Sequence, residues 1–242
     1  MARKRRPGFD TAAAPPHADG VTAPARSRTD VVIPARDAER DLPTTLDRAC
    51  LRELRALIVV DRGSGDGTAG VARDLGAVVL REAAGGYGAA CLRALAHFAE
   101  QPEDPDVVVF APPTARLDVE QLRRLLAPIE SGEAELTIGG APAARLRDRA
   151  VGRLIDAVYG HRFGRPGPIR AIRYPALVAL GMSDRGDGWD VEMLVRALRL
   201  GVGIVEVDLG TAVDPRQTGG VKAACAAGGR SLFHILRHAT VR

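Results

Sequence analysis

An aspartate at the end of an apolar run, with glycines behind it, is the first feature that could do chemistry. Asp61 follows the run 56–60, and glycines recur at every second position from 63 to 67. A carboxylate fixed at the end of a strand can accept hydrogen bonds from the imino or amino groups of a nucleobase. Local sequence alone favours a plainer role for Asp61 in a turn. Asp66 is expected to cap the helix that follows.

A second glycine-rich segment, 85–88, precedes another expected helix. Glycines let a ligand approach the backbone closely, but glycine-rich turns are common, and Tyr87 has simple packing as its alternative. Arg170 lies in a later Gly/Pro-containing stretch. Its guanidinium could pair with a phosphate through two hydrogen bonds or with a surface carboxylate.

Strands and helices that alternate along the chain are expected to position these residues. The expected strands are 30–34, 56–60, 77–80, 106–110, 135–140, 203–207 and one to which the Gly/Pro loop 164–173 leads. The expected helices lie around 42–49, 68–75, 89–98, 118–129, 151–159, 190–200 and 231–238. Helices of about 10 residues between strands act as crossovers, so the pattern predicts an α/β fold: one Rossmann-like domain with a mostly parallel sheet flanked by helices. Ligands bind such sheets beyond the carboxyl ends of the strands.

Composition restricts the class of protein. The 242 residues are 46% hydrophobic and 26% charged, enough for a core, and no apolar run reaches the roughly 20 residues of a membrane span. The net charge of +4 comes from the ends: residues 1–28 carry +4, residues 215–242 carry +5, and the segment between carries −5. We expect a disordered basic arm over 1–28 and one domain over 29–242. Three widely spaced cysteines indicate neither a zinc site nor disulfides, which favours a cytoplasmic protein.

Five segments, in order, resemble the inverting family 2 glycosyltransferases, especially the dolichyl- or polyprenyl-phosphate sugar synthases. They are Val31–Glu39, Val59–Thr68, Gly86–Ala90, Gly167–Ile172 and Trp189–Met193. The second segment is similar to the family signature Val-Asp-Asp-Gly-Ser-x-Asp-Gly-Thr. The resemblance implies a GT-A fold that binds a UDP- or GDP-sugar.

The resemblance also implies roles for single residues. The nucleotide-sugar-binding residues would be Pro34, Glu39, Asp61, Gly63, Gly86, Tyr87, Gly88, Arg170 and Lys222. An inverting transfer needs a base that takes the proton of the acceptor hydroxyl, unless the acceptor is already anionic. Glu192 and Asp190 are the catalytic candidates, and Asp187 is a further one. A solvated helix carboxylate is the alternative for Glu192.

The chain departs from the family pattern where a metal would be held. The family's Asp-x-Asp aligns with Pro112-Pro113-Thr114, so we expect no cofactor and neither Mg²⁺ nor Mn²⁺. Arginines could replace the ion at the diphosphate. These candidates are Arg62, Arg116, Arg165 and Arg216. Two functions therefore stay open: sugar transfer without a conventional metal motif, or a catalytically inactive pseudo-glycosyltransferase that serves as a binding, regulatory or partner-assembly module.

The expected partners follow from these alternatives. A nucleotide or nucleotide-sugar is the first, and a protein partner is the second. The basic amphipathic stretch 231–238 could lie on a membrane surface, which would suit a lipid-phosphate acceptor, or it could dock on the core. Nucleic acid is not expected, because no basic face with aromatic platforms is visible.

Overall fold

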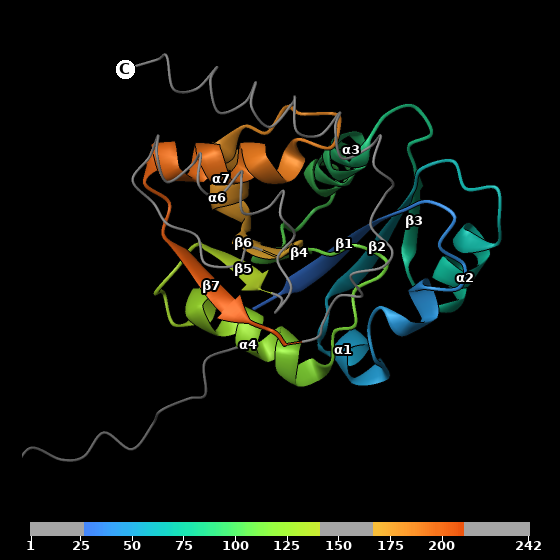
Figure 1. Ribbon diagram of the computed structural model, residues 1–242, viewed down its shortest axis with the longest axis horizontal. Coiled ribbons are helices and arrows are strands. Elements are labelled where there is room, and N and C mark those ends of the chain that lie inside the picture. Colours follow the sequence, from blue (N-terminus) through green and yellow to red (C-terminus); the bar gives the residue numbers. More distant parts are fainter. Residues whose placement is uncertain (1–26, 141–166, 211–242) are drawn as a thin grey trace, which may run out of the picture.

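Seven strands form one sheet in the computed structural model, which describes residues 27–140 and 167–210 (Figure 1). The strands are β1 (Thr29–Ala35), β2 (Ala56–Asp61), β3 (Val78–Arg81), β4 (Val107–Phe110), β5 (Leu136–Gly140), β6 (Ile169–Arg173) and β7 (Ile204–Asp208). Their order is β3-β2-β1-β4-β6-β5-β7. All neighbours are parallel except β6, which is antiparallel to both β4 and β5. The predicted α/β fold with a mostly parallel sheet is confirmed.

Helices cover both faces of the sheet. They are η1 (Leu42–Thr44), α1 (Arg48–Glu53), α2 (Thr68–Asp74), α3 (Tyr87–Ala99), α4 (Val119–Glu130), α6 (Tyr174–Leu180) and α7 (Trp189–Leu200). Helices α3, α6 and α7 pack on one face, and α1, α2 and α4 pack on the other (Figure 1). The strands supply both cores because successive side chains point to opposite faces. In β1, Val32 belongs to the first core, whereas Val31 and Ile33 belong to the second.

An aromatic contact attaches α7 to the sheet. Trp189, the first residue of α7, is fully buried, and its ring meets the ring of Phe110 edge-on, with centroids 5.7 Å apart. Phe110 is the last residue of β4. The start of α7 is therefore fixed above the carboxyl end of a central strand.

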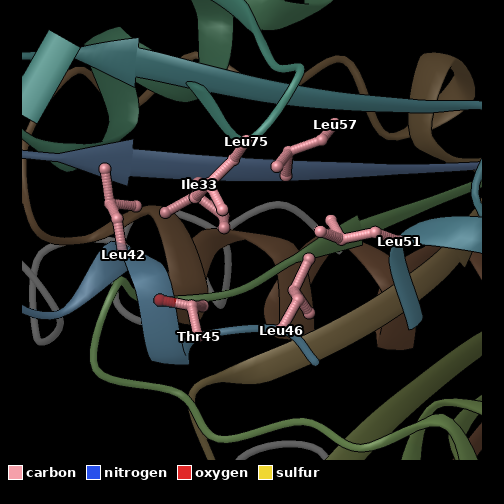
Figure 2. Close-up of a pocket in the computed structure, with 7 residues that line it drawn as sticks. All are labelled: Ile33, Leu42, Thr45, Leu46, Leu51, Leu57 and Leu75. Carbon is pink, nitrogen blue, oxygen red and sulfur yellow. The ribbon is translucent and has the colours of Figure 1, made fainter. Parts of the chain in front are cut away.

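The segment expected as one helix around 42–49 is two short elements instead. Its apolar side chains still meet the sheet: Figure 2 shows Leu42, Leu46 and Leu51 converging on Ile33 and Leu57. The single helix is interrupted for two local reasons. Leu46 forms a bridge with Leu117, and the carboxylate of Asp47 accepts the amide hydrogen of Cys50 (2.6 Å), which starts α1 as a new helix.

Helix α6 was not expected from the sequence. It follows β6 directly, with Pro175 in its first turn and Gly181 in the left-handed conformation (φ +59°) at its end. Both are common helix boundary signals. In contrast, the expected cap at Asp118 is confirmed, because Asp118 and Gln121 exchange side-chain to backbone hydrogen bonds at the start of α4.

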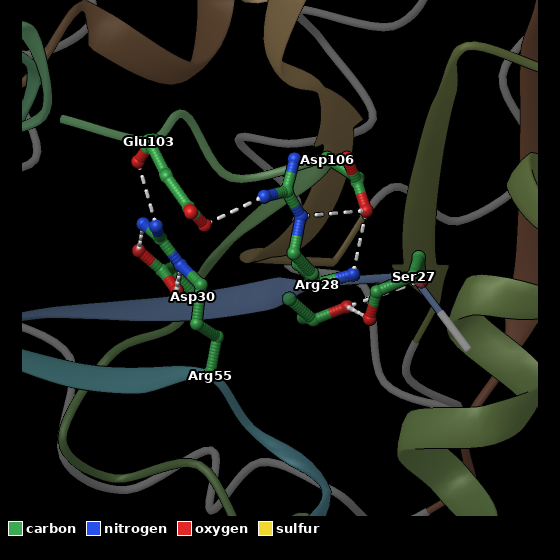
Figure 3. A network of polar contacts seen from close by, with 7 residues as sticks. Ser27, Arg28, Asp30, Arg55, Glu103 and Asp106 are labelled. Atoms are coloured by element: carbon green, nitrogen blue, oxygen red, sulfur yellow. Dashed lines mark hydrogen bonds and ion pairs between the residues drawn. The ribbon is translucent and has the colours of Figure 1, made fainter. Parts of the chain in front are cut away.

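Ion pairs connect residues at the amino-terminal edge of the sheet, where the parallel strands begin (Figure 3). Arg55 donates from two nitrogens to the buried carboxylate of Asp30, at 2.8 and 2.6 Å. Arg28 pairs with Glu103 and Asp106, at 2.9 and 3.2 Å. Arg28 was expected in the disordered arm but contacts the domain. This edge is opposite to the one where ligands are expected.

Two expected helices, 151–159 and 231–238, lie outside the described residues, as does most of the basic arm. Within residues 27–140 and 167–210, no helix has both the length and the apolar character that a membrane crossing requires.

Candidate functional site

The loops that follow β1 and β2 are hydrogen-bonded to each other at the carboxyl edge of the sheet. The amide of Gly65 donates to Asp37 (2.8 Å), and the amide of Gly67 donates to Glu39 (3.0 Å). The amide of Glu39 in turn donates to Asp66 (3.1 Å). Glu39, predicted to bind nucleotide, therefore uses its carboxylate and its backbone to join the two loops.

Asp66 also contacts the start of α2, although the N-cap residue of this helix is Gly67 and not Asp66 as expected. Its carboxylate accepts a hydrogen bond from the amide of Thr68 (3.0 Å). A further bond from the Thr68 hydroxyl lowers the pKa of Asp66. That hydroxyl accepts the amide hydrogen of Ala38 (2.8 Å), which adds another link between the loops. These contacts make the edge beside Asp61 a preformed backbone scaffold.

Asp61 is buried (3% exposed) at the end of β2. One carboxylate oxygen, Oδ1, accepts the amide hydrogen of Ser64 at 2.9 Å. Within the described part of the chain, Oδ2 has no hydrogen-bond partner. The backbone oxygen of Asp61 accepts from the amide of Glu82 (2.9 Å), so the exit of β3 lies against it. The turn role expected from local sequence is thus present, and it leaves one oxygen able to accept a hydrogen bond from a ligand.

The glycine segment Gly85–Gly88 packs closely against another backbone. The amides of Gly86 and Gly88 donate to the carbonyl oxygens of Arg185 and Gly186, at 2.9 and 2.7 Å. A Cβ atom on Gly86 would lie 2.7 Å from the Gly186 Cα, and one on Gly88 would lie 2.0 Å from the Asp184 oxygen. Close backbone approach was predicted here for a ligand, and the approach in the structure is that of residues 184–186.

The carboxylate of Glu192 binds the backbone of the same loop, at residues 183 and 184. Its side chain is fully buried and accepts hydrogen bonds from the amide of Asp184 (2.7 Å) and from the amide and hydroxyl of Ser183 (3.0 and 2.7 Å). Arg196 forms an ion pair with it at 2.9 Å. Burial opposes ionisation of this carboxyl group, but the hydrogen bonds and the charge of Arg196 lower its pKa overall. This is the geometry of a carboxylate that holds a loop.

Asp190 and Arg170 form an ion pair of 2.6 Å between α7 and β6. The Arg170 side chain is 5% exposed and that of Asp190 is 36% exposed. Tyr87 lies near this pair: burial, the neighbouring Cys91 thiol and the charge of Asp190 raise the pKa of its hydroxyl. Three predicted site residues, Tyr87, Arg170 and Asp190, are therefore brought together. Burial raises the pKa of the neighbouring Cys91 thiol, and the charge of Arg62 opposes that rise.

Several buried polar atoms near the carboxyl edge have no hydrogen-bond partner among the described residues. They are Arg62 Nε, Arg170 Nε, Thr114 Oγ1 and Trp189 Nε1. Three of these four groups are obligate donors, so acceptor oxygens would satisfy them.

The segment after β4 is folded on itself. The carbonyl oxygen of Pro112 accepts from the amide of Ala115 (3.0 Å), and that of Pro113 accepts from the hydroxyl of Thr45. Arg116, a predicted cation substitute, pairs with Asp41 at 3.5 Å.

The remaining predicted residues divide into two groups. Pro34 lies in β1 opposite Val60, and Gly63 adopts the left-handed conformation (φ +76°) in the β2 loop. Arg165, Arg216 and Lys222 lie outside the described residues. Asp184 was not among the predicted residues, but its Oδ1 accepts the amide hydrogens of Gly186 and Gly188. The Asp-x-Gly-x-Gly pattern of residues 184–188 was the available signal.

Comparisons with known proteins agree with this arrangement. The family model described as glycosyl transferase family 2 matches residues 30–179. An uncharacterized glycosyltransferase of Mycobacterium tuberculosis strain H37Rv is 33% identical over 187 residues, which cover 74% of this chain and 83% of that protein. Glucosyl-3-phosphoglycerate synthase from M. tuberculosis, solved with Mn²⁺, UDP and phosphoglyceric acid, superposes with a TM-score of 0.77 at 22% identity and covers 89% of this chain and 80% of its own. The same synthase with Mg²⁺ and UDP gives a TM-score of 0.74 at 22% identity, with 89% and 80% covered.

These neighbours correct one expectation. We expected neither Mg²⁺ nor Mn²⁺, but the solved structures hold one of these ions together with UDP. The part of this chain that the structure describes does not by itself form a site for such an ion. It contains no group of three or more His, Cys, Asp or Glu side chains that could hold a metal, and of Pro112, Pro113 and Thr114 only Thr114 has a side-chain oxygen. Binding of UDP to this protein is therefore to be measured in the presence of Mn²⁺.

Proposed function

Since the chain belongs to glycosyl transferase family 2, we propose that it binds a uridine nucleotide-sugar and transfers the sugar to an acceptor. One observation carries the proposal: Asp61 is buried at the carboxyl end of β2, with Oδ1 fixed by Ser64 and Oδ2 available. A uracil N–H is a suitable donor to that oxygen. The choice of uridine is supported by the UDP in the solved structural neighbours.

The surroundings of Asp61 suit a rigid base site. The β1 and β2 loops are joined by five hydrogen bonds between 2.8 and 3.1 Å, so little ordering is needed when a ligand binds. The glycine segment continues the same edge, because Glu82 at the exit of β3 is hydrogen-bonded to Asp61. The proposed base site lies between the β2 loop and this segment.

Of the two catalytic candidates that lie in α7, Asp190 and Glu192, we assign the base to Asp190. It is partly exposed, and Arg170 holds it at the start of α7, whereas Glu192 is fully buried and surrounded by its own donors. In the proposed step, the acceptor hydroxyl gives its proton to Asp190 while the hydroxyl oxygen forms a bond to the anomeric carbon of the sugar. The bond from that carbon to the diphosphate breaks, and UDP leaves with the electron pair.

The test is release of UDP from UDP-glucose, UDP-galactose and UDP-N-acetylglucosamine in Mn²⁺, with a mixed panel of hydroxyl and phosphate acceptors. We expect turnover of at least one donor by the wild-type protein and a loss of about 100-fold or more in kcat for Asp190→Asn, because general base catalysis contributes about 10²–10⁴-fold. Asp74→Asn, at an exposed site in α2, is the matched control. No turnover of any donor, or full activity of Asp190→Asn, would contradict the proposal.

The comparisons give the pseudoenzyme alternative no support.

A further inference from the structure

A continuous series of hydrogen bonds runs from Glu192 in α7 to the amino-terminal turn of α3. We propose that Glu192 is a positioning residue, which acts through residues 183–186 to hold the glycine segment Gly85–Gly88 in place at the nucleotide site. This inference rests on the proposed function, because it assigns that segment to nucleotide binding.

The first link joins Glu192 to the loop. Oε2 accepts the amide hydrogens of Ser183 and Asp184 (3.0 and 2.7 Å), and Oε1 accepts the hydroxyl of Ser183 and the Nε of Arg196 (2.7 and 3.0 Å). Both oxygens are therefore occupied, and the side chain has no exposed surface. Glu192 cannot reach a substrate without breaking these bonds, so its contacts favour a positioning role over direct proton transfer.

The second link shapes the loop itself. Oδ1 of Asp184 accepts the amide hydrogens of Gly186 (2.7 Å) and Gly188 (3.1 Å). These bonds hold residues 184–188 in a turn directly before α7 begins. The orientation of the carbonyl groups at 185 and 186 follows from this turn.

The third link reaches the nucleotide site. The Arg185 carbonyl accepts from the amides of Gly86 (2.9 Å) and Ala89 (3.1 Å), and the Gly186 carbonyl accepts from Gly88 (2.7 Å). Amides of the first turn of a helix have no partner within the helix, so the loop supplies what α3 itself lacks. If the support from Glu192 weakens, the first turn of α3 loses its acceptors.

Hydrogen–deuterium exchange tests the inference directly, without a substrate. We compare Glu192→Gln and the milder Ser183→Ala with the wild-type protein, and we use Glu133→Gln, at an exposed site after α4, as the control. We expect the peptide over residues 84–91 to exchange about tenfold faster in both variants than in the wild type, while the peptide over β1 is unchanged. Ser183→Ala keeps the carboxylate, so it tests the link even if Glu192→Gln folds poorly. Unchanged exchange over 84–91 in both variants would overturn the proposal.

Kinetics separate positioning from catalysis. A positioning role predicts that Glu192→Gln raises the Kd for UDP and the KM for the donor about tenfold, lowers kcat less, and leaves the pH dependence of kcat unchanged. A base role predicts the reverse: kcat collapses, its dependence on pH is lost, and the Kd for UDP stays the same. That second pattern would overturn the inference. If the wild-type protein binds no UDP, the proposed function fails, and the exchange experiment still reports on the hydrogen-bond series.

Discussion

Gly88 lies so close to Asp184 that a Cβ atom on Gly88 would stand 2.0 Å from the Asp184 carbonyl oxygen. Real Cβ atoms do not approach a backbone oxygen to this distance, so residue 88 must be glycine as long as the loop keeps its position. Two segments about 100 residues apart in the sequence thereby share one backbone interface at the carboxyl edge of the sheet.

The first prediction compares two glycines. Gly88→Ala should destabilise the protein by about 1–3 kcal/mol, because the backbone must shift to admit the methyl group. Gly70→Ala should stabilise it by about 0.5–1 kcal/mol, since Gly70 is inside α2 and a Cβ there meets no atom within 4 Å. Urea unfolding followed by circular dichroism measures both. Equal effects of the two substitutions would show that the loop is not where the structure has it.

Some parts of this structure could be predicted from the sequence alone, and others could not. The runs of Val and Ile in β1, β2 and β4 predicted buried strands, and Asp118 predicted the start of α4, because these signals are local. The antiparallel direction of β6 has no local signal. The contact of Gly88 with residue 184 also depends on tertiary packing, so a glycine in a turn was predicted and its neighbour was not.

The site residues follow the same division. Asp61 was identified from its place after a strand and from the family resemblance; the structure has it buried at the end of β2, and its role in base binding stays a prediction. Glu192 was predicted as a catalytic carboxylate because its motif matched, but a motif does not reveal burial. Whether it takes part in catalysis stays a prediction, and the structure gives it the contacts of a support.

The second prediction concerns the amino-terminal edge. Asp30→Ala should cost about 1.5–3 kcal/mol, because it removes the buried carboxylate that accepts two hydrogen bonds from Arg55. Asp106→Ala, which breaks an exposed pair with Arg28, should cost about 1 kcal/mol or less. Urea unfolding separates the two. A similar loss in the free energy of unfolding in both variants would mean that the buried Asp30 pair stabilises the fold no more than the exposed pair does. Neither substitution should alter UDP affinity at the opposite edge.

The third prediction concerns pH. The pKa of Glu192 in the folded protein is lower than its ordinary value of 4.5, so its ionised form stabilises the fold. That contribution is complete above the unfolded pKa and is lost as the pH falls through the lower folded value. The free energy of unfolding should therefore fall more steeply below pH 4.5 in the wild-type protein than in Glu192→Gln. Glu133→Gln should keep the wild-type slope. Parallel slopes for the wild type and Glu192→Gln would contradict the lowered pKa.

The most direct measurement is a calorimetric titration of UDP in Mn²⁺ into the wild-type protein, Asp61→Asn and the control Asp74→Asn. Asparagine keeps an oxygen for the Ser64 amide but offers N–H hydrogens in place of Oδ2, so a uracil N–H meets a donor instead of an acceptor. A hydrogen bond to a charged group contributes about 1.5–3 kcal/mol. We predict that the wild type and Asp74→Asn bind UDP with equal affinity and that Asp61→Asn binds it at least about tenfold more weakly. No binding of UDP by the wild type, or equal affinity in all three proteins, would contradict a uridine site at Asp61.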